Sequence, residues 1–221
     1  MDFLAQSTSL LIMLFPSLVS GFLITVSVAA AAMPLALLIG ILLVGPRMSG
    51  KAVLTFPAAA YIEFMRNTPL LLQIYLIYFG LPLFGLYPSE FSCGVIGIAL
   101  QHGAFFVETY RGGIESISPR QWEAARAIGM TRFGAFWNVI LPQALLRILG
   151  PLGNQLIILV KDTSLVSAIG VAELTMTGKV AIERTATSIE IFVSIAIFYL
   201  ALTSFLGAGT RLLEHRTQGR A

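Results

Sequence analysis

The sequence predicts an all-α, polytopic membrane protein with about five transmembrane helices. Of its 221 residues, 57% are hydrophobic and only 11% are charged, whereas soluble domains usually carry about 25% charged residues. The mean hydropathy is +0.86. Because a helix needs about 20 apolar residues to cross the hydrocarbon core, this length allows roughly five crossings. We therefore expect one transmembrane domain over residues 1–221.

Five apolar segments predict these crossings. They cover about Ser17–Val44, Thr68–Leu86, Ser92–Tyr110, Gly150–Ile169 and Ile189–Leu206. The stretch Ala52–Asn67 leads to the second segment but is interrupted by a proline and two charged residues. We expect this stretch to be interfacial or re-entrant. The long uncharged run before Arg47 exceeds the apolar region of a signal peptide, so the first segment is expected to be a retained span.

The basic residues indicate how the chain is oriented. Two of them follow the first segment, five arginines lie between the third and fourth, and three follow the fifth. The stretch 87–91 carries none and the stretch 170–188 carries two. Because basic loops stay in the cytoplasm, we expect the N-terminus outside and the C-terminus inside. The net charge of +3 is then an orientation signal, and we expect no contact with nucleic acid.

Residues 111–149 form a cytoplasmic loop in this topology, and a short helix is predicted within it. The Ser118 hydroxyl can accept from the Gln121 amide, and the Gln121 side chain can reach back. Pro119 suits the first helical position because its missing N–H needs no partner there. Gly129 is well placed to end the helix in a left-handed turn.

A second short helix is expected directly afterwards. Thr131 can cap it, it would run from Arg132 towards Leu141, and Pro142 would bend the chain before the fourth span.

One face of the first loop helix carries Trp122, Ala125 and Gly129. Ala124 and Ala125 allow the backbone of a neighbouring molecule to approach closely. Such a helix suits a groove on a partner protein. It equally suits the lipid headgroups, with Trp122 as an interfacial anchor.

The same loop resembles the EAA loop of bacterial ABC importer permeases. The matching residues are Glu123, Ala124, Ala125, Gly129, Leu141 and Pro142. Val139 stands where that family usually has Ile. In the family this loop is a coupling helix that fits a cleft in the ATP-hydrolysing subunit. The resemblance implies that these residues make that contact, with Glu123 as a capping and interface residue and not a catalytic one.

Three further motifs resemble permeases of polar amino acid importers. Phe64–Gln73 resembles their R-G-T-P-L-L-x-Q stretch, with Asn67 in place of Gly. Glu108–Ile114 resembles the run before the EAA loop, and Lys161–Leu165 matches K-D-T-S-L. Together the motifs cover about half of the chain. They imply a type I ABC importer permease in a bacterial inner membrane, which works by alternating access.

The resemblance also implies partners. They are two copies of an ATP-binding subunit, a second permease that is identical or paralogous, an external amino-acid-binding protein, and membrane lipid. ATP and Mg would bind the partner subunit, so this chain is expected to be no enzyme and to hold no cofactor or metal. Gly45–Ala52 nearly fits a phosphate-binding loop, but Ala52 lacks the required hydroxyl and no strand precedes it.

Polar residues inside the predicted spans are candidates for a substrate pathway. They are Gln101, His102, Lys161, Asp162, Thr163 and Ser164. A charge at a helix centre costs roughly 2.5–3.5 kcal/mol on insertion scales, so such residues usually face a cavity or a partner. The alternative is a satisfied network that holds the helices in register, and it fits the residues at least as well. The chain can also unwind at Lys161–Asp162.

Candidate structural ion pairs involve Glu63, Arg66 and Glu108. Lys161 could pair with Glu63 or Glu108, and Arg66 could pair with Asp162.

Two other classes of membrane protein remain as alternatives. A secondary transporter driven by an ion gradient would carry an internal repeat with paired broken helices, and none is found. A structural anchor would gain nothing from charged residues inside a span.

Overall fold

The computed structural model describes residues 2–218 and contains no strand within that range, which confirms the all-α fold. In chain order its elements are α1 (Asp2–Met48), α2 (Ala52–Asn67), α3 (Leu70–Gly80), the 3₁₀ segment η1 (Leu81–Phe84), α4 (Glu90–Glu115), α5 (Pro119–Ala127), α6 (Arg132–Ala135), the π-helical segment η2 (Phe136–Ile140), α7 (Leu141–Asp162), the 3₁₀ segment η3 (Thr163–Ile169), α8 (Leu174–Thr185) and α9 (Ile189–Gln218).

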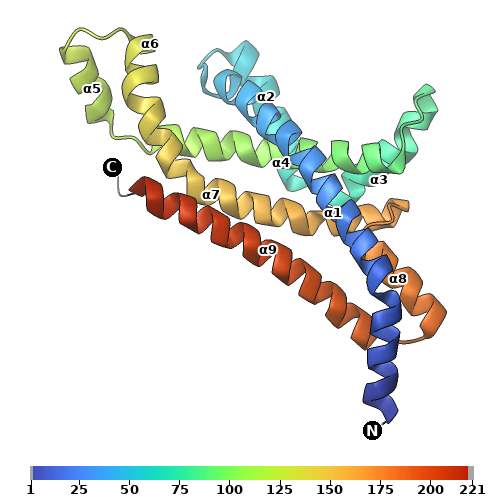
Figure 1. The fold of residues 1–221 in the computed structure, drawn as a ribbon. Helices are drawn as coiled ribbons and strands as arrows, with labels where there is room; N and C mark the ends of the chain where they lie inside the picture. The colour runs from blue at the N-terminus through green and yellow to red at the C-terminus, as the bar shows by residue number, and fades with distance from the viewer. Residues whose placement is uncertain (1, 219–221) are drawn as a thin grey trace.

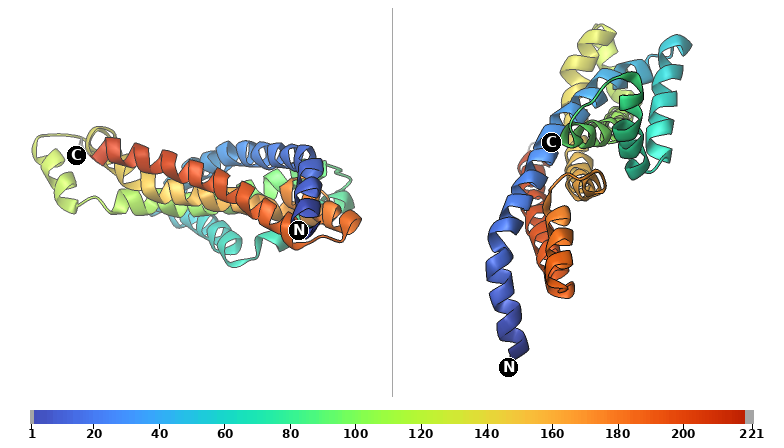
Figure 2. Two further views of the ribbon diagram at one scale, coloured as in Figure 1. Left: turned by 60° about the horizontal axis from the view of Figure 1, so that its bottom comes forward. Right: turned by 90° about the vertical axis from the view of Figure 1, so that its right-hand side faces the viewer.

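Helix α4 lies at the centre of the fold (Figure 1). Helix α1 packs along it, and α7 packs between α4 and α9. The short helix α5 and the C-terminal end of α9 lie at one end of the molecule, as Figures 1 and 2 show. At the other end, α8 packs against the N-terminal half of α1. The loop that carries α5 and α6 is thus held away from α8.

Four helical stretches are long and apolar enough to cross a membrane in the described part of the chain. They are Ile12–Met48, Glu90–Glu115, Arg132–Ile169 and Ile189–His215. A fifth crossing exists if α2 and α3, which are bent by 107° at their junction, count as one span. This agrees with the expected number of about five.

The second predicted span, Thr68–Leu86, is shorter than expected, and it is bent sharply relative to α2. Helix α3 has only 11 residues, which rise about 16 Å and fall short of a hydrocarbon core of about 30 Å. The chain breaks before it because the residue preceding a proline avoids the helical conformation, and Thr68 is extended, with φ −111° and ψ 143°.

Two buried amides hold this break together. The Gln73 side chain donates to the carbonyls of Met65 and Thr68 at 3.0 and 3.2 Å. The Gln101 side chain, from α4, donates to the same two carbonyls at 3.2 and 3.0 Å. Carbonyls at the end of a helix lack partners within it, so these amides replace the missing hydrogen bonds.

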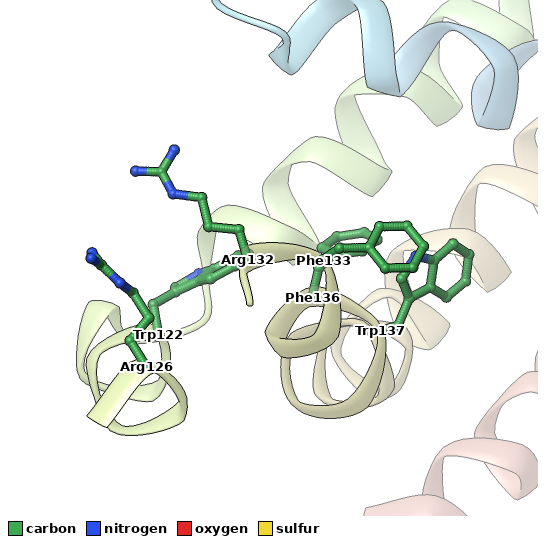
Figure 3. Close-up of a pocket in the computed structure, with 6 residues that line it drawn as sticks. All are labelled: Trp122, Arg126, Arg132, Phe133, Phe136 and Trp137. Atoms are coloured by element: carbon green, nitrogen blue, oxygen red, sulfur yellow. The ribbon is translucent and has the colours of Figure 1, made fainter. Parts of the chain in front are cut away.

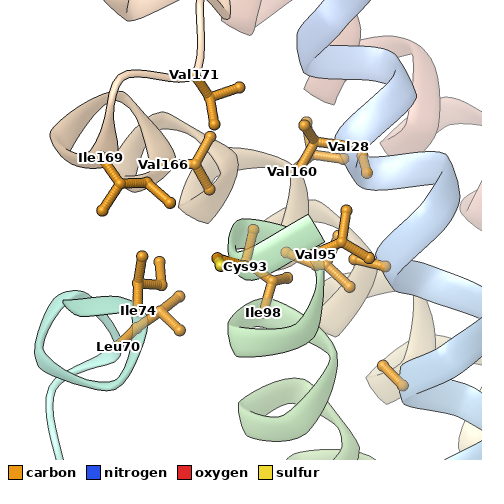
Figure 4. Close-up of a cluster of buried hydrophobic side chains, with 14 of the residues drawn as sticks. Val28, Leu70, Ile74, Cys93, Val95, Ile98, Val160, Val166, Ile169 and Val171 are labelled. Carbon is orange, nitrogen blue, oxygen red and sulfur yellow. The ribbon is translucent and has the colours of Figure 1, made fainter. Parts of the chain in front are cut away.

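The largest apolar core lies where α1, α3, α4 and η3 meet. Val28, Ile74, Ile98 and Val166 are completely buried there, and Figure 4 shows them converging. Close contact of α1 with α4 depends on Gly103, because a Cβ at this position would lie 2.6 Å from Cγ2 of Ile39.

The fourth predicted span, Gly150–Ile169, lies within a longer helical stretch, because α7 already starts at Leu141. The π-helical segment η2 precedes it, and there the Leu141 amide donates to the Phe136 carbonyl. Pro142 has no amide to offer the Asn138 carbonyl, and the wider π turn absorbs the break. Figure 1 shows the helix changing direction between α6 and α7, which agrees with the expected bend.

Candidate functional site

The loop helix α5 begins and ends largely as its sequence predicts. Pro119 occupies the first turn, and the left-handed turn at Gly129, with φ +84°, ends the helix. The Met130 amide closes this turn on the Ala125 carbonyl at 3.1 Å. The predicted capping box is wrong, because the Ser118 hydroxyl accepts from the Arg120 amide instead.

Gln121 fails to close the capping box because its side chain turns to another helix. Its Oε1 accepts from Gln143 Nε2 in α7 at 3.5 Å. Thr131 does cap α6 as expected, accepting from the Gly134 amide at 3.1 Å.

The face of α5 that carries Trp122 and Ala125 points into the loop itself. Ala125 is only 3% exposed, and the Trp122 ring stacks on Phe136 of η2, with centroids 6.5 Å apart. Figure 3 shows Trp122 and Phe136 turned towards each other. These rings cover a small core that includes Ile140 and Ala144. Contrary to expectation, this face is therefore not free to contact another protein.

A different face of α5 is exposed. Glu123 and Ala124 are exposed, Ile128 is 75% exposed, and Gly129 beyond the helix is exposed as well. Ile128 thus adds an exposed apolar side chain to this outer face of α5. Of the two other candidate coupling residues, Leu141 lines a cavity beside α1 and α4, and Pro142 is exposed at the start of α7.

The predicted polar residues of the spans form one close contact. His102 of α4 is 1% exposed, and its Nε2 lies 3.0 Å from Asp162 Oδ2 at the end of α7. Its Nδ1 lies 2.8 Å from Gln155 Nε2. The Gln155 amide nitrogen can only donate, so in this arrangement Nδ1 accepts and Nε2 donates to Asp162. The ring is thereby satisfied at both nitrogens.

Gln155 was missed by the sequence reasoning, although a signal existed. It lies seven residues before Asp162, which is two helical turns, so both side chains share one face of α7. A polar residue on that face of an apolar helix is a reason to look for a partner.

The other candidate pathway residues lie apart from this contact. Thr163 is fully buried and donates to the Val160 carbonyl at 2.7 Å, and Ser164 is half-buried. Gln101 is 8% exposed and stabilises the break between α2 and α3 through its hydrogen bond to the Met65 carbonyl. The Lys161 side chain is exposed and makes no ion pair or hydrogen bond within residues 2–218.

The three predicted ion pairs do not form in the described part of the chain. Glu108 binds Arg47 of α1 and Arg111 of its own helix. Glu63 accepts from Asn67 at 2.9 Å, one turn away.

Arg66 lies over the ring of Phe105, 5.3 Å from its centroid, and Asp162 is occupied by His102. The pairings were wrong because α1 lies along α4 and brings Arg47, not Lys161, to Glu108.

A buried carboxylate outside the spans also went unpredicted. Glu173 is fully buried and caps α8, where it accepts from the amides of Thr175 and Met176 at 2.9 and 2.8 Å. It also accepts from the Tyr199 hydroxyl of α9 at 2.9 Å. Burial raises the pKa of the Glu173 carboxyl, although these hydrogen bonds lower it in part. Its position just before a helix was the available signal.

No group of three or more His, Cys, Asp or Glu residues suited to hold a metal ion occurs among residues 2–218.

Comparisons with known proteins cover nearly the whole chain. The family model for the binding-protein-dependent transport system inner membrane component matches residues 32–219. The glutamine transport system permease protein GlnP of Escherichia coli K12 is 39% identical over 203 residues, which are 91% of this chain and 93% of that protein. The probable glutamine ABC transporter permease protein GlnM of Bacillus subtilis is 34% identical over 213 residues, or 96% and 99% of the two chains.

A solved structure agrees with these relatives. A chain in the crystal structure of an amino acid ABC transporter with histidines superposes with a TM-score of 0.90 at 35% identity, and the match covers 98% of this chain and 99% of that one. Because these relatives are ABC transporter permeases, they favour an ATP-driven importer over the ion-gradient alternative.

Proposed function

The chain belongs to the family of binding-protein-dependent transport system inner membrane components, and from this premise we propose that it is the permease of an ATP-driven importer for a polar amino acid. The observation that supports this best is the α5 loop, with its packed inner face and exposed outer face. The loop is built to stay folded while its outer face contacts another protein.

In this proposal the outer face of α5 contacts an ATP-binding subunit, one for each of two permeases. Glu123, Ala124 and Ile128 supply the contact. ATP and Mg bind the partner, and closure of the two partners around ATP pushes on α5. The small core of Ile140 and Ala144, against which Trp122 and Phe136 pack, passes this push to α7, because packed side chains transmit strain.

Helix α7 links the loop to the polar contact inside the membrane. It begins at Leu141 beside η2 and ends at Asp162, a distance of about 33 Å for its 22 residues. A rigid shift at the loop therefore moves Asp162. The change from α-helix to 3₁₀ helix directly after Asp162 suits a hinge there, since such changes often mark one.

We assign to Asp162 the role of binding the ammonium group of the transported amino acid. Its side chain is 30% exposed, whereas that of His102 is 1% exposed. His102 and Gln155 then serve as positioning residues that orient the carboxylate, and Thr163 and Ser164 form the turn beside it. A carboxylate that already accepts one hydrogen bond, here from His102, can accept further hydrogen bonds from a cation.

A second permease, identical or paralogous, completes the pathway. Asn154 and Lys161 are exposed on one face of α7, seven residues apart. A charge within a span is costly when it faces lipid, so another subunit or a water-filled path should cover this face. An external binding protein delivers the amino acid in a bacterial inner membrane. The N-terminus is outside and the α5 loop is in the cytoplasm.

Reconstitution in vesicles tests the proposal. Uptake should require ATP, the ATP-binding subunit and the external binding protein together, and omission of any one should abolish it. Uptake by the permease alone under an ion gradient would refute the proposal.

Site-specific crosslinking tests the docking face separately. Buried Cys93 is first replaced by Ser, and a new cysteine is placed at Ala124 or, as a matched control, at Ala125. The exposed Ala124→Cys should be captured by the ATP-binding subunit and the buried Ala125→Cys should not. Capture of Ala125→Cys alone would contradict the assigned face.

A further inference from the structure

Two adjoining cavities run from the α5 loop to the ends of three spanning helices. The first, about 770 Å³, is lined by Trp122, Arg126, Arg132, Phe133, Phe136 and Trp137 (Figure 3). The second, about 500 Å³, lies among α1, α4, η2 and α7. Phe136 and Trp137 line both cavities and pack edge to face at 5.6 Å. The two cavities therefore share an aromatic wall.

The first cavity is cationic on one side and aromatic on the other. Arg126 and Arg132 extend to one side, while Phe133 and Trp137 lie opposite, as Figure 3 shows. The side chains of both arginines are exposed and make no ion pair or hydrogen bond within residues 2–218. A pair of guanidinium groups without acidic partners suits a phosphate, which arginine can bind through two parallel hydrogen bonds.

The second cavity is apolar and reaches membrane depth. Ile41, Val44 and Leu152 are among its lining residues, and all three lie in helices that are long and apolar enough to cross the bilayer. Tyr110 lines it near the end of α4. Tyrosine and tryptophan are enriched at the headgroup level, so Tyr110 and Trp137 mark the boundary between headgroup and hydrocarbon.

We propose that these two cavities together bind one anionic phospholipid of the cytoplasmic leaflet. Arg126 and Arg132 hold its phosphate, and an acyl chain passes Trp137 into the apolar cavity. The ATP-binding subunit is the other candidate occupant. It is disfavoured because the apolar cavity lies between spanning helices, beyond the reach of a soluble protein surface. Basic pockets beside transmembrane helices on the cytoplasmic side suit anionic headgroups.

Tryptophan fluorescence provides a direct readout, because the two tryptophans of the chain both line the first cavity. The full-length permease is reconstituted in phosphatidylcholine vesicles that contain small amounts of brominated phosphatidylglycerol or brominated phosphatidylcholine. Bromine on an acyl chain quenches a nearby tryptophan. Selective quenching by the brominated phosphatidylglycerol is expected. Its apparent affinity should be about 30-fold higher than that of phosphatidylcholine, which corresponds to about fivefold for each arginine.

Two variants and their controls test the two halves of the site. The preference for the anionic lipid should be lost in the double variant Arg126→Gln with Arg132→Gln. It should remain in the control variant Arg120→Gln with Arg211→Gln, which removes the same charge elsewhere. Gly45→Leu fills the apolar cavity without a clash, since nothing lies within 4 Å of the added Cβ, and should reduce quenching. Gly209→Leu is the control, because it is equally open and remote from the cavity.

Equal quenching by the two lipids, or a preference that survives loss of both arginines, would overturn the proposal. The ATP-binding subunit would then be the occupant of the cavity, and its addition should shift the tryptophan emission. Displacement by millimolar inorganic phosphate would also overturn it, because the site would then bind free phosphate and not lipid. These outcomes do not depend on transport, so they are distinct from a failure of the proposed function.

Discussion

His102 of α4 and Asp162 of α7 are joined inside the membrane by a contact of 3.0 Å between Nε2 and Oδ2. Gln155 holds the other ring nitrogen at 2.8 Å. Helices α4 and α7 are thereby fixed in register at the point where α7 tightens into η3. This contact can be tested both as a structural link and as part of a substrate site.

As a structural link, the contact should be measurable in unfolding experiments. His102→Leu removes the donor to Asp162 and should lower the free energy of unfolding in detergent by about 1–2 kcal/mol, the range for such bonds in membranes. A double-mutant cycle with Asp162→Asn isolates the pair. His215→Leu, at the exposed second histidine, should leave stability unchanged. Strictly additive effects of His102→Leu and Asp162→Asn would show that the two residues are not coupled.

As part of a substrate site, Asp162 should matter more for transport than for folding. Asp162→Asn keeps an oxygen that can accept from His102 but loses the charge. A hydrogen bond to a charged group contributes about 1.5–3 kcal/mol, so the apparent affinity for substrate should fall about 10- to 100-fold. Uptake kinetics in vesicles measure this, with the free energy of unfolding as control. Normal uptake kinetics would leave Asp162 with a structural role alone.

Two neighbouring alanines in α5 should respond in opposite ways to the same substitution. Ala125 is 3% exposed, so Ala125→Leu should overpack the loop and cost about 1–3 kcal/mol of stability. Ala124 is exposed, so Ala124→Leu should leave stability within about 0.5 kcal/mol while lowering ATP-driven uptake. Thermal unfolding and uptake, measured on both variants, separate the two effects. Similar behaviour of the pair would argue against a distinct inner and outer face.

Features encoded in neighbouring residues could be predicted from the sequence. The deficit of charge indicated lipid as the solvent and about five crossings. Gly129 indicated the left-handed end of α5 because other residues rarely adopt positive φ. Thr131 indicated the start of α6 for an equally local reason, since its hydroxyl bonds an amide three residues on.

Features that depend on which helices are neighbours could not be predicted in this way. The predicted ion pairs were chosen by the sign of the charges alone, whereas the packing of α1 along α4 brings Arg47 to Glu108. The apolar stretch Thr68–Leu86 was long enough for a span, yet α3 ends at Gly80 and continues only as the short segment η1, which ends at the left-handed Gly85. The face of α5 was inferred without knowing that η2 would supply Phe136 as a partner for Trp122. For the ion pairs and for the face of α5, a contact distant in sequence decided the outcome.

Glu173 should make stability depend on pH in the direction opposite to that of most paired carboxylates. Burial raises its pKa above the ordinary value of 4.5, so the folded protein binds this proton more tightly than the unfolded chain does. The protonated carboxyl therefore stabilises the fold fully below the unfolded-state pKa. This contribution is lost as the pH rises through the folded-state pKa.

Comparison with Glu173→Gln isolates this contribution, because the variant cannot titrate there. The difference in unfolding free energy, wild type minus variant, should be largest near about pH 4 and should decrease towards about pH 8. Glu183→Gln, at an exposed position of the same helix, should give a difference that varies little with pH. A difference for Glu173→Gln that instead grows with pH would mean that the amides of Thr175 and Met176, together with Tyr199, outweigh burial and hold this carboxylate ionised in the folded protein.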